Sequence, residues 1–323
     1  MKILVTGGNG LVGMALQEYV NKITKECKNY NANEYIFLTR QNCDLTKYHE
    51  TSIAFMLFKP DIVIHLASLV AGLYGNMSNN YEMFMENTIM HLNIIKCCKE
   101  FKIKRLINML STCVFPDGGV TYPLTSEQIM NGAPHNSNEG YAYSKRMLKL
   151  GSDLLVKSKD DFEVINIIPT NLYGKNDNYN LAKSHVIPGL IHKLYLAKQR
   201  HEPYFVVPGS GNAVRQFMYV EDLAKILHDC VDIMINGKSI DFIASVSIDY
   251  KITIKELVNK ITKLIDYQGV ILYDSTYPDG QMRKSTSSNE LIVLFPEFEF
   301  TDINNGLEKT INYFINNYNT IRK

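Results

Sequence analysis

The sequence predicts an α/β protein with a doubly wound parallel sheet and a smaller second α/β domain. In the first half of the 323 residues, short β-branched segments alternate with longer segments that have helical spacing. A glycine-rich loop follows the first of the β-branched segments, and the alternation ends after Thr170. Alternating strands and helices indicate parallel pairing, because consecutive parallel strands need a connection long enough to return.

The first half of the chain supplies the predicted sheet and its covering helices. Runs of β-branched and apolar residues place strands at 2–6, 35–39, 61–67, 105–111 and 164–170. Apolar residues that recur on one helical face place helices at 11–19, 48–58, 81–101 and 141–157. We therefore expect a parallel sheet with helices on both faces.

The second part of the chain has a different pattern. Residues 171–183 are rich in Asn and Asp and predict a loop. Beyond the loop, the spacing predicts helices at 185–198, 220–235, 252–265 and 303–318, and a strand at 204–207. The expected domains are 1–170 and, mainly, 171–323, with segments of about 200–245 returning to the first. No Pro- or Gly-rich linker separates them, so the cleft between them is the expected ligand site.

Charge and cysteine content exclude several classes of protein. Lys+Arg 34 against Asp+Glu 33 gives a formal charge of +1, which predicts no nucleic-acid or membrane partner. No window of the sequence reaches the roughly 18 consecutive apolar residues that a bilayer span needs. The apolar run among the first residues is too short for the core of a signal peptide. The six cysteines are too sparse for a secreted disulfide scaffold: Cys27, Cys43, Cys97, Cys98, Cys113 and Cys230. We expect a cytoplasmic protein, and we predict no metal site.

The glycine-rich loop is the first candidate site. Gly7, Gly10 and Gly13 lie between the first predicted strand and the first predicted helix. A helix N-terminus offers free N–H groups and a positive dipole end, and glycines let a diphosphate approach the backbone. A tight turn alone would also use glycine, but the position after a strand favours a dinucleotide site.

The end of the second strand indicates which dinucleotide is bound. An acidic residue there would bond the ribose 2′-hydroxyl of NAD, but no carboxylate occurs before Asp44. Arg40 suits the 2′-phosphate of NADP through its planar set of donors. A solvated surface arginine is the alternative. We predict NADP(H) as the cofactor, bound by the domain at 1–170.

A phenol and an ammonium stand four residues apart in the predicted helix at 141–157. Tyr141 and Lys145 share a helical face, so the cation can lower the pKa of the phenol and reach a ribose. Tyr179 and Lys183 have the same spacing but lie in the Asn-rich loop. Ser111 ends the fourth strand, at the sheet edge where ligands bind, and can hold a substrate oxygen beside Tyr141. We therefore prefer Tyr141 with Lys145 as the candidate pair.

These features, in this order, resemble the extended short-chain dehydrogenase/reductases that act on nucleotide sugars, which have a Rossmann fold. Residues 215–222 resemble the second-half signature of the family. The likeness extends to 111–116, 169–174, 177–178, 185–188 and 279–284, which cover nearly the whole chain. The likeness is greatest with those members of the family that convert GDP-4-keto-6-deoxy-D-mannose to GDP-L-fucose. That resemblance implies NADPH-dependent 3,5-epimerisation and 4-reduction of a GDP-sugar by a homodimer that pairs helices of the cofactor domain.

The resemblance also implies the site residues. The implied catalytic residues are Ser111, Cys113, Tyr141, Lys145 and His185. The implied cofactor-binding residues are Gly7, Gly10, Leu11, Val12, Gly13, Arg40, Lys145, Asn171, Leu172 and His185. The implied substrate-binding residues are Lys193, Arg215, Asp279 and Lys284. A 4-keto sugar has acidic C–H bonds at C3 and C5, and Cys113 with His185 match the acid–base pair that epimerisation needs. Taken alone, Cys113 would be a small buried hydrophobe.

Two other functions remain open at this point. A nucleotide-sugar 4-epimerase or dehydratase has the same fold, but a dehydratase would need a carboxylate where this chain has Thr112 and Cys113. A 4-epimerase usually keeps NAD and would carry an acid after the second strand. A non-catalytic NADP-binding sensor would be free to lose Tyr141 or Lys145.

The chain also has Pro208 where the family commonly has tryptophan, and it contains no tryptophan.

Overall fold

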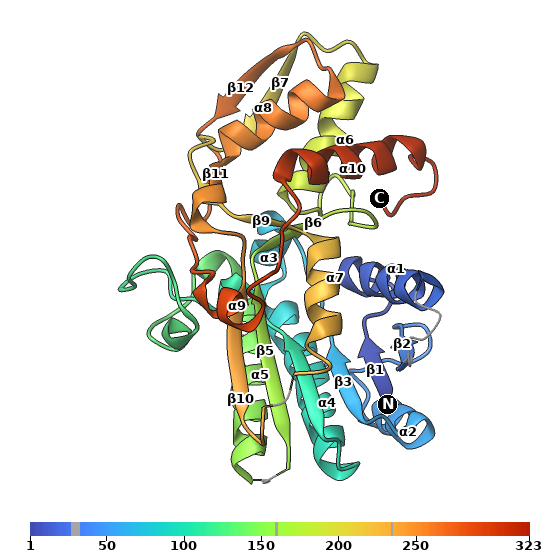
Figure 1. The fold of residues 1–323 in the computed structure, drawn as a ribbon. Helices are drawn as coiled ribbons and strands as arrows, with labels where there is room; N and C mark the ends of the chain where they lie inside the picture. The colour runs from blue at the N-terminus through green and yellow to red at the C-terminus, as the bar shows by residue number, and fades with distance from the viewer. Residues whose placement is uncertain (27–32, 159–160, 234) are drawn as a thin grey trace.

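A six-stranded parallel sheet forms the centre of the larger part of the molecule (Figure 1). The computed structural model describes residues 1–26, 33–158, 161–233 and 235–323, so Cys27 lies outside the described residues. The sheet has the order β10-β5-β4-β3-β1-β2. The strands are β1 (Lys2–Thr6), β2 (Glu34–Leu38), β3 (Ile62–His65), β4 (Arg105–Met109), β5 (Glu163–Pro169) and β10 (Ser239–Ala244).

Helices cover both faces of the sheet because its strands are apolar on both sides. Ile3 and Val5 of β1 pack in a cluster with residues of α1 (Leu11–Glu26) and α7 (Val220–Asp229). Leu4, which points to the opposite face, packs with residues of α2 (Tyr48–Phe58), α4 (Asn80–Glu100) and α5 (Glu139–Ser158). The predicted doubly wound sheet is confirmed.

The order of the strands places a topological switch point at β1. From β1 the chain passes to β2 on one side and then returns to β3 on the other. Ligands of open α/β sheets bind at the carboxyl ends of the strands where the order reverses. The glycine loop at 7–10 lies at that position.

The smaller part of the molecule lies beyond this edge of the sheet (Figure 1). The parallel strands β7 (Tyr204–Pro208) and β12 (Val270–Asp274) pack with α6 (Val186–Gln199), α8 (Ile254–Ile265) and α10 (Ile303–Asn316) around a second apolar core. Two short pairs lie between the parts. They are β6 (Asn171–Tyr173) with β9 (Phe217–Tyr219), and β8 (Val214–Arg215) with β11 (Ile252–Thr253).

The structure corrects several predicted segments. The loop prediction for 171–183 is wrong at β6, whose three residues pair with β9 and need no periodic pattern. The helix predicted at 220–235 ends at Asp229, and the buried Arg105 guanidinium donates to the carbonyl of Val231 and so holds the chain out of the helix. The helix predicted at 252–265 starts at Ile254, because Thr253 caps it in a capping box with Glu256.

Other elements were not predicted. The first helix extends to Glu26, beyond the predicted end at residue 19. The short helices α3 (Leu73–Ser78) and α9 (Asn289–Leu294) and the edge strand β10 carry too little sequence pattern of their own to be predicted.

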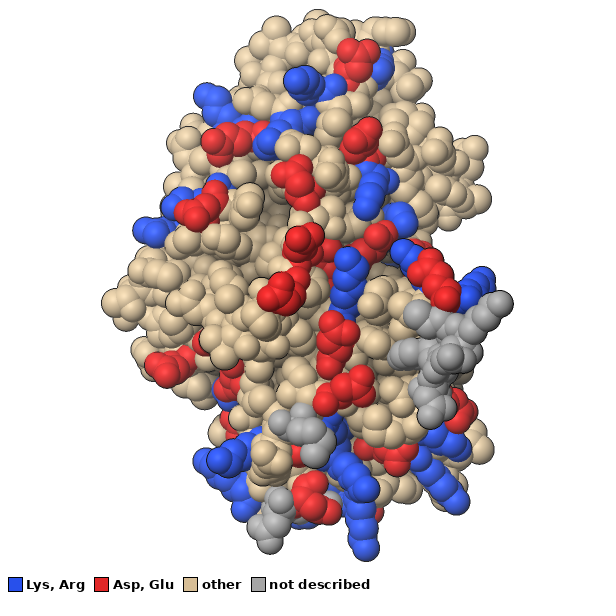
Figure 2. Space-filling view, in the orientation of Figure 1, with Lys and Arg blue, Asp and Glu red and all other residues tan. Residues whose placement is uncertain are grey.

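None of the helices within the described ranges has the length and apolar content that a bilayer crossing requires. Figure 2 shows basic and acidic side chains interspersed over one face of the molecule.

Candidate active site

One cleft between the two parts of the molecule collects the predicted site residues. It has a volume of about 740 Å³ and is lined from both parts. Its lining includes each of Gly7, Gly10, Leu11, Val12, Gly13, Arg40, Ser111, Cys113, Tyr141, Lys145, Asn171, Leu172, His185, Lys193, Arg215, Asp279 and Lys284. Residues more than 270 positions apart in the sequence therefore meet at the carboxyl edge of the sheet.

The glycine loop forms a tight cradle at the start of α1. Gly7 has φ +74°, and a Cβ there would lie 2.8 Å from the amide nitrogen of Ala67. A Cβ on Gly13 would lie 2.4 Å from the carbonyl oxygen of Gly7. Larger residues are therefore excluded, and the N-terminus of α1 stays open to the cleft. This cradle fits the diphosphate of a dinucleotide.

Arg40 lies just beyond β2 and lines the same cleft. Its side chain is 73% exposed, and its guanidinium lies 3.9 Å from the carboxylate of Glu86, which α4 supplies. The sequence places no carboxylate at the end of the second strand, but the fold brings Glu86 there. Because the pair is solvent-exposed, it holds Arg40 only weakly. The guanidinium is available to an anionic ligand.

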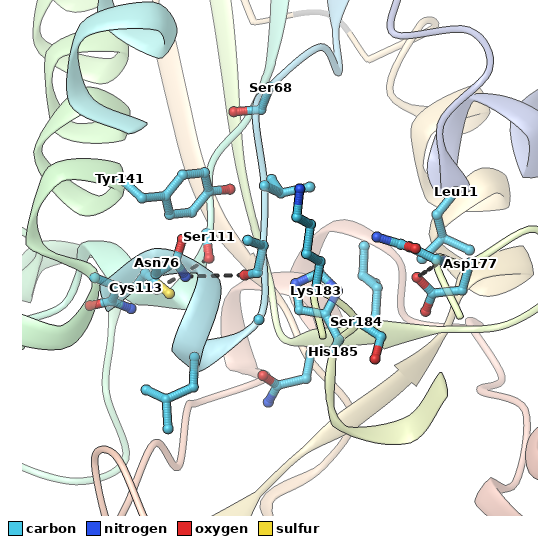
Figure 3. A pocket seen from close by; sticks show the side chains of 18 of the residues that line it. Leu11, Ser68, Asn76, Ser111, Cys113, Tyr141, Asp177, Lys183, Ser184 and His185 are labelled. Atoms are coloured by element: carbon cyan, nitrogen blue, oxygen red, sulfur yellow. Dashed lines mark hydrogen bonds between the residues drawn. The ribbon is translucent and has the colours of Figure 1, made fainter. Parts of the chain in front are cut away.

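Tyr141 lies in the first turn of α5 and points its hydroxyl into the cleft between Ser68 and Ser111 (Figure 3). Both serines lower the pKa of the phenol, against the larger effect of burial. Ser111 caps the short 3₁₀ turn Thr112–Val114 and accepts a hydrogen bond of 3.2 Å from the amide of Cys113. The two hydroxyls of Ser111 and Tyr141 can therefore approach one oxygen atom of a ligand.

Lys145 lies one turn further along α5 and is 1% exposed. Its Nζ donates to the carbonyl oxygen of Met109 at 2.8 Å and lies 5.7 Å from the centre of the Tyr141 ring. Burial lowers the pKa of Lys145 to about 7. The expected lowering of the phenol pKa is not found, because burial raises the pKa of Tyr141 well above its usual value. Burial therefore favours the neutral phenol.

The alternative pair of the Asn-rich loop does not form a site. Tyr179 is fully buried, and its hydroxyl donates to the carbonyl of Gly174 at 3.2 Å. Its spacing partner Lys183 instead lines the cleft and points into it (Figure 3). The structure thus separates Tyr179 from Lys183 and keeps Tyr141 with Lys145.

Cys113 and His185 enter the cleft from different parts of the molecule. The Cys113 sulfur accepts a hydrogen bond of 3.6 Å from the Lys284 ammonium. His185 is the residue before α6 and is exposed to the cleft. The site therefore places a thiol beside a cation and, separately, an imidazole.

Asp177 is a cleft residue to which the sequence assigned no role. It is 3% exposed, and its Oδ2 has no hydrogen-bond partner. Burial raises the pKa of Asp177 to about 6, although the charges of His185 and Arg322 oppose the rise. Its burial depends on folding of the loop between β6 and α6, so sequence spacing gives no signal for it.

Three further cationic side chains line the cleft. Lys193 lies on α6, Arg215 on β8 and Lys284 in the loop before α9. Burial lowers the pKa of Lys193 and that of Arg215. Asp279 accepts hydrogen bonds from the amide and the hydroxyl of Ser210, so its carboxylate fixes the turn after β7. No group of acidic, His and Cys side chains in the described ranges is arranged to hold a metal ion.

The fold and the cleft define an enzyme of the Rossmann type, with the site of an extended short-chain dehydrogenase/reductase. The family model described as "NAD dependent epimerase/dehydratase family" matches residues 3–237. The chain belongs to this family.

Comparison with relatives that match over their full length places the chain more narrowly within the family. The chain is 39% identical over 325 residues to GDP-L-fucose synthase of Dictyostelium discoideum, covering 99% of this chain and 97% of the relative. It is 33% identical to the probable GDP-L-fucose synthase of Drosophila melanogaster, covering 100% and 99%. A crystal structure of a GDP-L-fucose synthetase from Naegleria fowleri bound to NADP is similar with a TM-score of 0.89 and 34% identity, over 100% of this chain and 96% of that one.

Proposed function

We propose that the protein uses NADPH to convert GDP-4-keto-6-deoxy-D-mannose to GDP-L-fucose, by epimerisation at C3 and C5 and reduction at C4. The observation that carries the proposal is that one cleft holds both Tyr141 with Lys145, which reduction needs, and Cys113 with His185, which epimerisation needs. Similarity over the full length to GDP-L-fucose synthases supports it.

The larger part of the chain would hold the cofactor. The cradle at 7–13 receives the diphosphate, and Arg40 the 2′-phosphate. Lys145, Asn171, Leu172 and His185 would contact the nicotinamide end, and NADPH, when bound, supplies the hydride for C4. In this assignment residues 1–170, with β10 and α7 from about 200–245, form the NADP domain, and the remaining part of 171–323 holds the GDP-sugar.

Epimerisation would precede reduction because only the ketone makes C3 and C5 acidic. Of Cys113 and His185, one removes the proton from the ring carbon and the other returns a proton to the opposite face. The electron pair of the broken C–H bond becomes an enolate, whose oxygen accepts hydrogen bonds from Ser111 and Tyr141. In the reduction, Tyr141 gives its proton to the C4 oxygen, which suits its raised pKa.

The GDP group would be held by the three further cations. Lys193, Arg215 and Lys284 line the cleft, and cations match a diphosphate. Asp279 acts by fixing the turn at Ser210. The place of the family tryptophan is taken by Pro208, so the nucleoside is held without an indole.

We also propose a homodimer in the cytoplasm. The apolar side chains Met85, Ile89 and Leu92 of α4 and Leu150 and Leu154 of α5 are each 37–54% exposed, and α4 packs beside α5. Two copies that pair these helices would bury the apolar stripe. Sedimentation of the wild type and of an Ile89→Lys, Leu154→Lys variant tests this: a monomeric wild type contradicts it. The five free cysteines of the described residues suit a reducing compartment.

Incubation with NADPH and GDP-4-keto-6-deoxy-D-mannose tests the function. We expect loss of nicotinamide absorbance and a GDP-L-fucose product. Binding of NADPH with no turnover would favour a sensor. An altered sugar formed without net NADPH oxidation would favour a different epimerase or a dehydratase.

A further inference from the structure

Residues 282–287 form a short segment, here called the Lys284 segment, that packs against Leu124. The amide of Leu124 donates to the carbonyl oxygen of Ser285 at 2.9 Å, and its carbonyl oxygen accepts from the amide of Ser287 at 2.8 Å. Ser285 and Ser287 are both buried. The position of Lys284 therefore depends on what holds this buried segment to the rest of the fold.

The side chain of Gln216 ties the Lys284 segment to the edge of the central sheet. Gln216 lies between β8 and β9 and is 1% exposed. Its Oε1 accepts from the amide of Thr286 at 2.7 Å, and its Nε2 donates at 2.8 Å to the carbonyl oxygen of Val246, just beyond β10. A backbone amide only donates and a carbonyl only accepts, so the orientation of the Gln216 amide is determined.

Two hydroxyls complete the hydrogen bonding around Gln216. Its Nε2 also donates to the Ser245 oxygen at 3.0 Å, and Ser245 gives its own proton to the carbonyl of Val246 at 2.8 Å. The Thr286 hydroxyl lies 3.0 Å from the Gln216 Oε1 and 2.9 Å from the Ser245 oxygen, so its proton can go to either. All four residues are buried. A buried polar network in which the groups find partners is rigid.

This tie fixes Lys284 relative to Cys113. Cys113 follows β4, which belongs to the same sheet as β10. Lys284 precedes Thr286 by two residues, and its ammonium donates to the Cys113 sulfur at 3.6 Å. Gln216 therefore connects the backbone that carries the cation to the sheet that carries the thiol.

We propose that Gln216 is a positioning residue: through Thr286 it holds the Lys284 segment at the sheet edge, so that the Lys284 ammonium stays in contact with the Cys113 sulfur. The inference rests on the proposed function, in which Cys113 takes part in epimerisation. Gln216 itself is not among the residues that line the cleft, so it acts through Lys284.

The test is a double-mutant cycle on the alkylation of Cys113 in the full chain. Gln216→Met keeps a side chain of similar length but makes none of the hydrogen bonds of the amide. We expect iodoacetamide to modify Cys113 about three times more slowly in Gln216→Met than in the wild type, because Lys284 is no longer held against the sulfur. In the Lys284→Gln background the same substitution should have no further effect. Mass spectrometry of the Cys113 peptide measures the four rates.

Asn166→Leu is the matched control, because Asn166 is also a fully buried amide, and it bonds to Asn108 and Asp241 within the sheet. It should leave the alkylation rate unchanged. An unchanged or higher rate in Gln216→Met overturns the proposal. Equal slowing in both backgrounds, or slowing in Asn166→Leu, overturns it as well, since the effect would not pass through Lys284.

Thr286→Val is a second variant, which removes the hydroxyl but keeps the backbone amide bond to Gln216. It should slow the alkylation about twofold, and only while Lys284 is present. If Gln216→Met does not fold, Thr286→Val decides in its place, and an unchanged rate overturns the proposal. The measurement needs no substrate. A wild type that makes no GDP-L-fucose would therefore refute the proposed function, while the cycle still decides the role of Gln216.

Discussion

The ammonium of Lys284 lies 3.6 Å from the sulfur of Cys113, although the two residues are 171 positions apart in the sequence. Lys284 belongs to the loop that precedes α9, and Cys113 to the turn that follows β4. A cation in contact with a sulfur favours negative charge on that sulfur in reactions where the thiol acts as a base or a nucleophile. The contact therefore links a predicted substrate-binding residue to the proposed acid–base chemistry.

This contact predicts the reactivity of Cys113. Iodoacetamide should modify Cys113 about ten times more slowly in Lys284→Gln than in the wild type, because the cation is lost. Mass spectrometry of the Cys113 peptide gives the rate. Lys183→Gln is the control, since Lys183 lies in the same cleft but apart from Cys113 (Figure 3). Equal rates in the wild type and Lys284→Gln would show that the contact has no effect on the thiol.

Cofactor preference should depend on Arg40 and Glu86. Arg40→Ala should weaken NADPH binding about tenfold and leave NADH binding nearly unchanged, because in the proposed assignment the guanidinium would contact only the 2′-phosphate. Glu86→Gln should strengthen NADPH binding about twofold, since it removes the carboxylate 3.9 Å from Arg40. Nicotinamide fluorescence measures both affinities without interference from tryptophan, which the chain lacks. Equal affinity of the wild type for both cofactors contradicts the assignment.

The two half-reactions should separate at Tyr141. Tyr141→Phe should abolish NADPH oxidation but still let solvent deuterium enter the keto sugar, because removal of the carbon-bound proton needs no hydride. Mass spectrometry of the recovered sugar measures the exchange. Tyr179→Phe is the control: its hydroxyl bonds to Gly174 inside the core, so we expect a loss of stability of about 1 kcal/mol and normal chemistry. Loss of NADPH oxidation in Tyr179→Phe would contradict the assignment of the acid to Tyr141.

Burial of the Lys145 side chain should lower the free energy of unfolding at neutral pH. Its pKa is about 7 in the fold, below the value of roughly 10.4 for an unfolded lysine. Between these values the unfolded chain holds a proton that the folded chain lacks, so the stability rises with pH in this window and is lowest below pH 7. Lys145→Met should therefore stabilise the fold, by about 3 kcal/mol at pH 6 and by less at pH 9. Denaturant unfolding at the two pH values checks this; a variant that is less stable at pH 6 contradicts it.

Elements with a long local pattern were predictable from the sequence. The helix predicted at 48–58 coincides with α2, and the first five strands lie within a few residues of their predicted places. Strands β6, β8, β9 and β11 have two or three residues each, and their partners in the fold determine them. The acidic and polar neighbours Glu86, Asp177 and Ser68 were missed as site groups for the same reason. Tertiary contacts alone bring them to the cleft.

The identity of the sugar produced by Cys113→Ser and His185→Gln tests the central claim most directly. Cys113→Ser should bind NADPH normally, and His185→Gln should bind it more weakly because a contact to the nicotinamide end is lost. Both variants should fail to complete epimerisation at C3 or C5, and so reduce an incompletely epimerised ketone. The measurement is NMR of the sugar nucleotide formed with NADPH and GDP-4-keto-6-deoxy-D-mannose. We predict GDP-L-fucose from the wild type and a different GDP-6-deoxyhexose from each variant. GDP-L-fucose formed by both variants at an undiminished rate would contradict the assignment of Cys113 and His185.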